Sequence, residues 1–267
     1  MDEREKLMYR LMDILNSMDA PIIFKGGLIT KLLLDNYGFS DLSRKTQDID
    51  ANWTQFPVSM EEIVDTINCA AKEINPFFSA VPSRNYGENR SAGIKIIDKK
   101  TCMNVLKMDI DLKVASPCLY YIGGLSFQGV DIKQIIADKV CSISNAHIFR
   151  RVKDLLDLYG LAKCGSFSAK DIMDLACSSG RKIGDFSAFE NNYEQLEYAY
   201  SKLKGTQEKP DFFTVYAFLN KFLEPFSKNI PICYWDAIRQ EWRDFEVCEQ
   251  EWDLEKNAEL NLDDMEL

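Results

Sequence analysis

The chain has 267 residues, of which 46% are hydrophobic and 28% charged, and its formal net charge at pH 7 is −10. This length allows one large domain or two modest ones, and the composition is that of an ordinary globular protein. The acidic balance argues against a protein that coats nucleic acid, although it leaves room for a local basic patch.

Two other classes of protein are not expected. No apolar run approaches the length that spans a bilayer, and the charged N-terminal stretch MDEREKLMYRLMDILNSM differs from a secretory signal. We therefore predict a cytoplasmic protein without membrane contact. The eight cysteines contain no CxxC pair and His147 is the only histidine, so a zinc site is not expected either.

Residues 1–130 are expected to form a domain that mixes helices and strands. Apolar spacing and an S-x-x-E capping box that begins at Ser59 predict helices over 2–18, 28–34 and 59–74. Runs of β-favouring residues between turn-prone clusters predict strands over 22–24, 48–53, 77–81, 93–97 and 103–114, followed by a hairpin over 118–130.

Residues 131–267 are expected to form a second, all-helical domain that packs on the first, because no Pro- or Gly-rich linker separates them. Helical patterns cover 131–144, 148–163, 168–178, 186–204, 211–226 and 231–250. The acidic segment EVCEQEWDLEKNAELNLDDMEL is expected to be a solvated helix. The predicted fold class is therefore α+β, with a mixed sheet followed by a helical C-terminal half.

The segment QDIDANW places two carboxylates on one predicted strand. Residues i and i+2 of a strand project from the same face, so Asp48 and Asp50 lie about 7 Å apart along it, with Ile49 on the opposite face. Like charges on one face repel each other, and a divalent cation removes this cost because Mg²⁺ prefers oxygen ligands. The alternative is an ordinary strand that ends beside solvent.

A second pair of carboxylates, Asp109 and Asp111, follows in VLKMDIDLKV. If this strand lies beside the first, three or four carboxylates converge, which is the arrangement of two-metal phosphoryl transfer.

The glycine pair in Lys25-Gly26-Gly27 stands between a predicted strand and a predicted helix. Backbone N–H groups at a helix N-terminus attract phosphate, and glycine allows a phosphate to approach closely. Lys25 adds a positive charge, and Arg44 and Lys45 stand just before the acidic strand. The alternatives are a tight turn without a ligand and solvated loop charges.

Charged residues also gather in the predicted helical domain. In RRVKDLLDLYGL, Arg151 and Asp154 are three positions apart and Lys153 and Asp157 are four apart, and these spacings favour ion pairs on a helix surface. Lys139, in the preceding helix, would bind nucleotide phosphates or stabilise developing negative charge if it faced a cleft.

Together these motifs resemble the DNA polymerase β-like nucleotidyltransferase superfamily, and more closely the abortive-infection AbiE toxin-type nucleotidyltransferases. The resemblance covers roughly residues 20–160, and it rests on the segments KGG, RKTQDID, KMDI and RVKDLLD and on Lys139. Two features depart from the superfamily pattern. Gly27 stands where many members have serine, and the spacer of twenty residues from Gly27 to Asp48 is longer than usual.

The resemblance implies a nucleotidyltransferase-type mixed sheet and assigns roles to residues of both halves. Asp48, Asp50 and Asp109 would bind Mg²⁺ or Mn²⁺ and act in catalysis, together with Lys139 and Asp154. The residues expected to bind the nucleotide are Lys25, Gly26, Gly27, Arg44, Arg151 and Lys153.

The activity that the resemblance implies is transfer of a nucleoside monophosphate from an NTP to an acceptor. In the toxin family the acceptor can be the tRNA 3′ end, and a cognate antitoxin neutralises the toxin, so the implied setting is toxin–antitoxin action or phage defence. Two alternatives stay open. One is nucleotidylation of a small molecule or a protein, and the other is a non-catalytic NTP-binding protein that acts through a partner.

Overall fold

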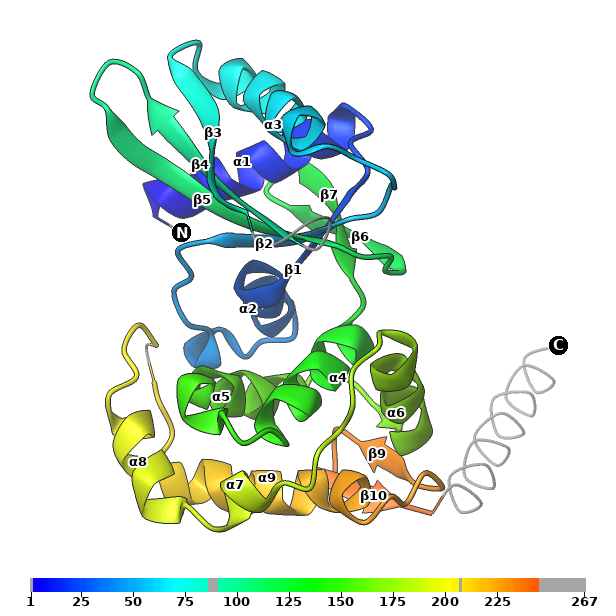
Figure 1. Ribbon diagram of the computed structural model, residues 1–267. Coiled ribbons are helices and arrows are strands. Elements are labelled where there is room, and N and C mark those ends of the chain that lie inside the picture. Colours follow the sequence, from blue (N-terminus) through cyan, green and yellow to red (C-terminus); the bar gives the residue numbers. More distant parts are fainter. Residues whose placement is uncertain (1, 86–90, 207, 245–267) are drawn as a thin grey trace, which may run out of the picture. The chain divides into compact units, whose positions relative to one another are not determined.

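Strand β1 (Ile22–Lys25) lies inside a seven-stranded sheet with the order β3-β4-β5-β2-β1-β7-β6. The computed structural model describes residues 2–85, 91–206 and 208–244 (Figure 1). They form two compact units, one with residues up to 135 and residues 205–206, the other with residues 136–204 and 208–244. Within these ranges no helix is both long and apolar enough to cross a bilayer.

The first unit contains the elements predicted for it in the predicted order. Its helices are α1 (Glu3–Ser17), α2 (Gly26–Asn36), η1 (Ser40–Leu42) and α3 (Met60–Ile74). Its other strands are β2 (Ile49–Trp53), β3 (Phe78–Asn85), β4 (Ser91–Asp98), β5 (Met103–Leu112), β6 (Pro117–Ile122) and β7 (Leu125–Val130). Two strand pairs, β2–β5 and β1–β7, are parallel, and the others are antiparallel, so the predicted mixed sheet is confirmed.

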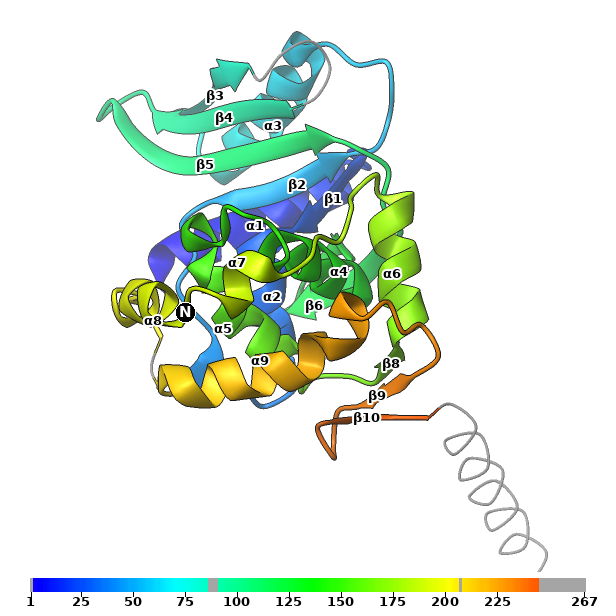
Figure 2. The same cartoon turned by 60° about the horizontal axis from the view of Figure 1, so that its bottom comes forward.

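Helices α1 and α3 cover one face of this sheet and α2 lies on the other (Figures 1 and 2). On the α1 side the core is aromatic at its centre. The ring of Phe127 lies 5.8 Å from that of Tyr9 and 6.0 Å from that of Phe24, measured between centroids. Burial of these rings holds α1 against β1 and β7, because apolar area removed from water is the main stabilising term in folding.

The second unit is mostly helical, whereas the sequence predicts an all-helical domain. Its helices are α4 (Ile132–Ile143), which begins in the first unit, η2 (Ile148–Arg150), α5 (Val152–Leu161), α6 (Ala169–Ser178), α7 (Ser187–Glu190), α8 (Tyr193–Ser201) and α9 (Phe212–Ser227). The helix predicted over 186–204 is interrupted between α7 and α8, where Asn191 and Asn192 stand. Asparagine competes with the helix by bonding nearby backbone, and the side chains of both residues donate to backbone carbonyls four positions earlier.

The helix predicted over 231–250 is wrong for the described residues. The chain instead forms β9 (Tyr234–Asp236) and β10 (Glu241–Arg243), which pair with β8 (Phe167–Ser168) in a three-stranded sheet beside α9 (Figure 2). Gln240 has a φ of 54°, a conformation that ends a helix. The buried Trp235 donates to the carbonyl of Ala162, a long-range contact that periodicity does not reveal. The segment 245–267, including the predicted acidic helix, lies outside the described residues.

Candidate active site

The two acidic strands lie side by side. Strands β2 and β5 are parallel, and their register pairs Asp50 with Asp109 and Asn52 with Asp111. Paired residues of neighbouring strands project from the same face about 4.8 Å apart, while Ile49 and Met108 are buried on the opposite face. The strands lie side by side as the prediction required, but the register pairs two carboxylates, Asp50 and Asp109, and not the three or four that the sequence predicted.

Asp109 also contacts an arginine from the edge of the sheet. Nη2 of Arg84, on β3, lies 3.2 Å from Oδ1 of Asp109. Arg84 spans β4 at Gly93, which pairs with both residues and has no side chain to obstruct the contact. Both partners are well exposed, with 59% and 44% of their side-chain area accessible. Such a pair contributes at most about 1 kcal/mol, so a ligand can displace it at small cost.

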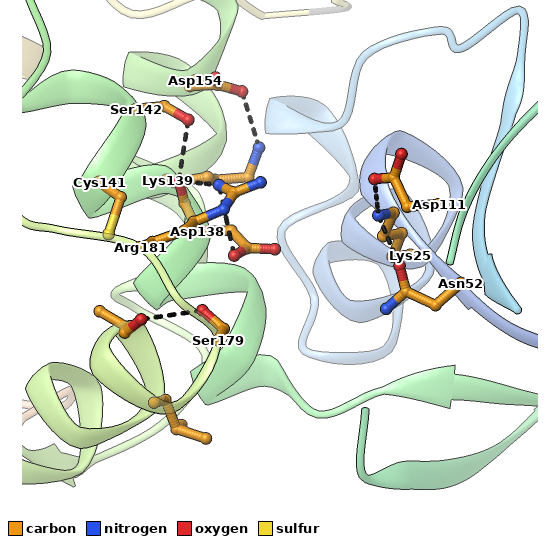
Figure 3. Close-up of polar contacts among 12 residues, drawn as sticks. Lys25, Asn52, Asp111, Asp138, Lys139, Cys141, Ser142, Asp154, Ser179 and Arg181 are labelled. Atoms are coloured by element: carbon orange, nitrogen blue, oxygen red, sulfur yellow. Dashed lines mark hydrogen bonds and ion pairs between the residues drawn. The ribbon is translucent and has the colours of Figure 1, made fainter. Parts of the chain in front are cut away.

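Lys25 binds the next pair of residues in the register of β2 and β5, Asn52 and Asp111. Its Nζ donates to Oδ1 of Asn52 and to Oδ2 of Asp111, both at 2.6 Å (Figure 3). The contact neutralises Asp111 and links β1, β2 and β5. The resemblance ranks Asp109 above Asp111 as the third acid of the site, and that assignment stays a prediction.

Both the backbone conformation at position 26 and the neighbouring Asp50 require glycine there. Its φ is +71°, and a Cβ atom added there would lie 2.2 Å from Oδ2 of Asp50. Only glycine adopts this conformation readily and leaves the space that the carboxylate occupies. The glycine turn and the acidic strand are thus in direct contact, and the position of Asp50 depends on Gly26.

The long spacer after Gly27 folds back onto the glycine turn. A Cβ atom on Gly27 would lie 2.7 Å from Oγ1 of Thr46 and 3.3 Å from Nη2 of Arg44. Arg44 therefore lies at the N-terminus of α2, which is the position where the sequence predicts phosphate binding. Arg44 also forms an isolated β-bridge with the distant Thr206. No local pattern in the sequence predicts this pairing.

Replacing Gly26 with alanine should lower both stability and activity. We expect a loss of about 2–6 kcal/mol in the free energy of unfolding, because backbone strain and a steric clash each cost about 1–3 kcal/mol. Gly38 provides a matched control, because its φ is +81° and an added Cβ atom meets nothing within 4 Å. Gly38→Ala should cost about 1–2 kcal/mol and leave nucleotidyl transfer unchanged. Equal effects of both variants in denaturation and transfer assays would contradict the proposed contact.

The donor chemistry of this region suits a divalent cation. Asp50 and Asp109 present carboxylates at one level of the sheet, and Mg²⁺ usually binds one or two carboxylates and completes its shell with water and substrate phosphates. Asp48 precedes β2 by one residue. Within the described ranges, no group of three or more His, Cys, Asp or Glu side chains is gathered for a metal ion. The metal-binding role of Asp48, Asp50 and Asp109 is thus a proposal.

The second unit contains a buried ionic cluster. Nζ of Lys139, on α4, lies 3.0 Å from Oδ1 of Asp154 and 2.6 Å from Oδ2 of Asp157, both on α5 (Figure 3). These three side chains have accessible fractions of only 9%, 8% and 1%. The alternative of surface ion pairs along α5 is therefore wrong for Asp154 and Asp157, because both are buried and bind a lysine of another helix.

Arg151 and Lys153 stand apart from this cluster. Both are exposed, and Arg151 is the N-cap residue of α5. Two residues that sequence reasoning did not select lie in the networks of the first unit: Arg84 and Asn52. No local signal identifies them, since each acts through a partner from another element.

The fold and the glycine–aspartate contact are consistent with one class of protein, the nucleotidyltransferases, and the family comparison establishes it. Residues 7–215 match the family described as nucleotidyl transferase AbiEii toxin of type IV toxin–antitoxin systems. This match covers more than half of the chain, so the chain belongs to the AbiEii family and is a nucleotidyltransferase. The family implies an NTP as substrate and an antitoxin as partner, and the resemblance inferred from the sequence is confirmed.

Several solved structures are similar in fold. JHP933 from Helicobacter pylori is 20% identical, with 85% of this chain and 94% of that chain covered and a TM-score of 0.45. MenT4, a nucleotidyltransferase toxin from Mycobacterium tuberculosis, is 14% identical, with 79% and 75% covered and a TM-score of 0.40. The antibiotic-resistance factor ANT(2″)-Ia is 14% identical, with 74% and 97% covered and a TM-score of 0.39. No curated protein matches significantly.

Proposed function

We propose that the protein transfers a nucleoside monophosphate from an NTP to an RNA acceptor, with the tRNA 3′ end as the first candidate, in a reaction that depends on Mg²⁺ or Mn²⁺. The observation that carries the proposal is the register of Asp50 with Asp109 beside the close contact of Asp50 with Gly26. It brings carboxylates and a glycine-opened helix N-terminus together in one unit.

Each part of this arrangement has a chemical task in the proposal. The N–H groups at the start of α2 and the guanidinium of Arg44 bind the triphosphate, because a helix N-terminus and an arginine both favour phosphate. The acceptor hydroxyl attacks the α-phosphorus, the bond to the β-phosphate oxygen breaks, and pyrophosphate leaves. Asp109 accepts the proton of the hydroxyl. Lys25 holds the sheet together through Asn52 and Asp111.

The metal ion would be held by Asp50 and Asp109, with Asp48 as the third candidate, and when bound it would neutralise negative charge on the phosphates. In the second unit, Lys139 and Asp154 stay proposed members of the catalytic set, and Arg151 and Lys153 stay proposed nucleotide-binding residues. Action in the cytoplasm and in phage defence belongs to the same proposal.

A label-transfer experiment tests this function. The protein is incubated with each α-³²P-labelled NTP, Mg²⁺ and total RNA, and the Asp48→Ala/Asp50→Ala double variant is the control. We expect label from a preferred NTP to enter a small RNA with the wild type and to be absent with the variant. Label in a small molecule or a protein would support the alternative acceptors. Absence of label from all three classes of acceptor would refute nucleotidyl transfer by this chain.

A further inference from the structure

A cavity of about 330 Å³ lies in the second unit. Of the residues that the proposed reaction uses, only Arg151 is among its described lining residues. Its wall comes from the end of α4, the turn before α5 and the loop after α6. The described lining residues that can donate hydrogen bonds through polar side chains are Ser142, Asn145, His147, Arg151, Arg181 and Lys182. None of the described lining residues is acidic, although the whole chain has a net charge of −10.

The loop that carries Arg181 and Lys182 is fixed to the end of α4. The backbone N–H of Gly184 donates to Oγ of Ser144 at 2.7 Å. A Cβ atom on Gly184 would lie 2.2 Å from the carbonyl oxygen of Ser144, so the two segments are in close contact. This contact holds the loop after α6 against the end of α4, while the polar side chains of the lining are mostly exposed.

Arg181 is oriented by an acidic neighbour. Its Nη1 donates to the backbone carbonyl of Asp138 at 3.2 Å and lies 3.3 Å from Oδ1 of the same residue (Figure 3). Both contacts use Nη1, and a guanidinium has five N–H donors in a fixed plane. The fixed orientation lowers the entropic cost of binding an anion through the other donors.

The charges around the cavity favour an anion. Arg151, Arg181 and Lys182 supply three full positive charges at neutral pH. Arg151 is also the N-cap of α5, a helix of 10 residues whose N-terminus adds a partial positive charge. The C-terminus of α4 opposes this with about half a negative charge, and Asp138 with one. The balance stays positive.

We propose that this cavity binds a phosphate group, carried either by an RNA strand or by a free nucleotide or pyrophosphate. Arginine donors match phosphate geometry, and the volume lies at the lower end of the range for small-ligand pockets. The choice of these ligands rests on the proposed function, since the reaction uses RNA, NTP and pyrophosphate, whereas the cavity itself does not depend on it.

The test compares two double variants that remove equal charge from the second unit. Arg181→Gln/Lys182→Gln changes the cavity. Lys170→Gln/Lys228→Gln changes two exposed lysines in surface ion pairs elsewhere and is the matched control. Binding of a fluorescein-labelled single-stranded RNA is measured by anisotropy over a range of salt concentrations, and binding of ATP and pyrophosphate by calorimetry. EDTA is present throughout, so that a metal ion at Asp50 and Asp109 cannot recruit phosphate.

We expect the cavity variant to bind RNA at least about tenfold more weakly than the wild type, with the slope of log K against log salt shallower by about 1.4, or 0.7 for each lost contact with a single strand. The control should change binding less than about threefold. A loss confined to ATP and pyrophosphate would assign the phosphate to the free ligands. Equal effects of cavity and control variants in both arms would overturn the proposal.

Two further measurements keep the result decisive. Thermal denaturation checks that the double variant folds, and the single variant Lys182→Gln, at an exposed position, should reduce the slope by about 0.7. The readout is binding without turnover. A protein that binds through the cavity but transfers no nucleotide would refute the proposed function alone, and one that transfers nucleotide without using the cavity would refute this inference alone.

Discussion

Asp50→Asn should lower the rate of nucleotidyl transfer by about 10²–10³-fold, which is the usual cost of removing one group that stabilises transition-state charge. Asparagine keeps the shape of the side chain but loses the charge that would hold a cation opposite Asp109. Stability should fall far less than activity, because asparagine keeps the shape of the side chain and Asp109 already has Arg84 as its ion-pair partner, so that relief of repulsion adds little. The rate and the melting temperature therefore report separate effects.

Steady-state transfer assays and thermal denaturation of the same preparations measure both effects. Asp41→Asn, at an exposed position of the same unit, makes the same chemical change and should leave the rate within twofold of wild type. Asp109→Asn should resemble Asp50→Asn. The Asp50→Asn/Asp109→Asn double variant should be little slower than either single variant, because groups that act as a unit are not additive. A rate for Asp50→Asn close to that of the wild type would remove this carboxylate from the proposed site.

Lys139→Met should lower the free energy of unfolding by about 3–5 kcal/mol, the cost of leaving buried charge without its partner. The lysine neutralises Asp154 and Asp157, and these carboxylates have accessible fractions of only 8% and 1%. This prediction concerns stability, so it holds whether or not Lys139 also takes part in the reaction. Urea denaturation followed by circular dichroism measures the effect.

The exposed pair of Lys170 with Asp174 provides the control, since 66% and 63% of these side chains is accessible. Lys170→Met should cost less than about 1 kcal/mol. The triple variant Lys139→Met/Asp154→Asn/Asp157→Asn should regain part of the lost stability, because it also removes the uncompensated charges. If Lys139→Met costs no more than Lys170→Met, the buried cluster does not have the energetic role assigned to it.

Local patterns were sufficient for most of the fold in the first unit. The capping box at Ser59 starts α3 as expected, with Ser59 accepting from the N–H of Glu62 and Glu62 accepting from the N–H of Ser59. Runs of β-favouring residues between turn-prone clusters predict β2 and β5. These signals depend on neighbours in sequence, so they can be read without a structure.

The C-terminal part shows where such patterns fail. The sequence pattern predicts a helix over Tyr234, Trp235 and Trp242, but these residues lie in β9 and β10. Aromatic residues suit strands as well as buried helices, and the choice is made by partners in distant elements. Trp242 donates from Nε1 to the carbonyl of Phe222, 20 positions earlier, and this contact has no trace in the local sequence.

The amino-acid sequence by itself determined which residue types this protein brings to phosphate chemistry: two acidic strands, a glycine turn and a lysine with a charged helix. Only the tertiary structure decided which of them meet. It pairs Asp50 with Asp109, gives Asp111 to Lys25 and buries Lys139 with Asp154 and Asp157. The physical reason is that strand register and helix packing join residues far apart in the chain, whereas composition and spacing report only on neighbours.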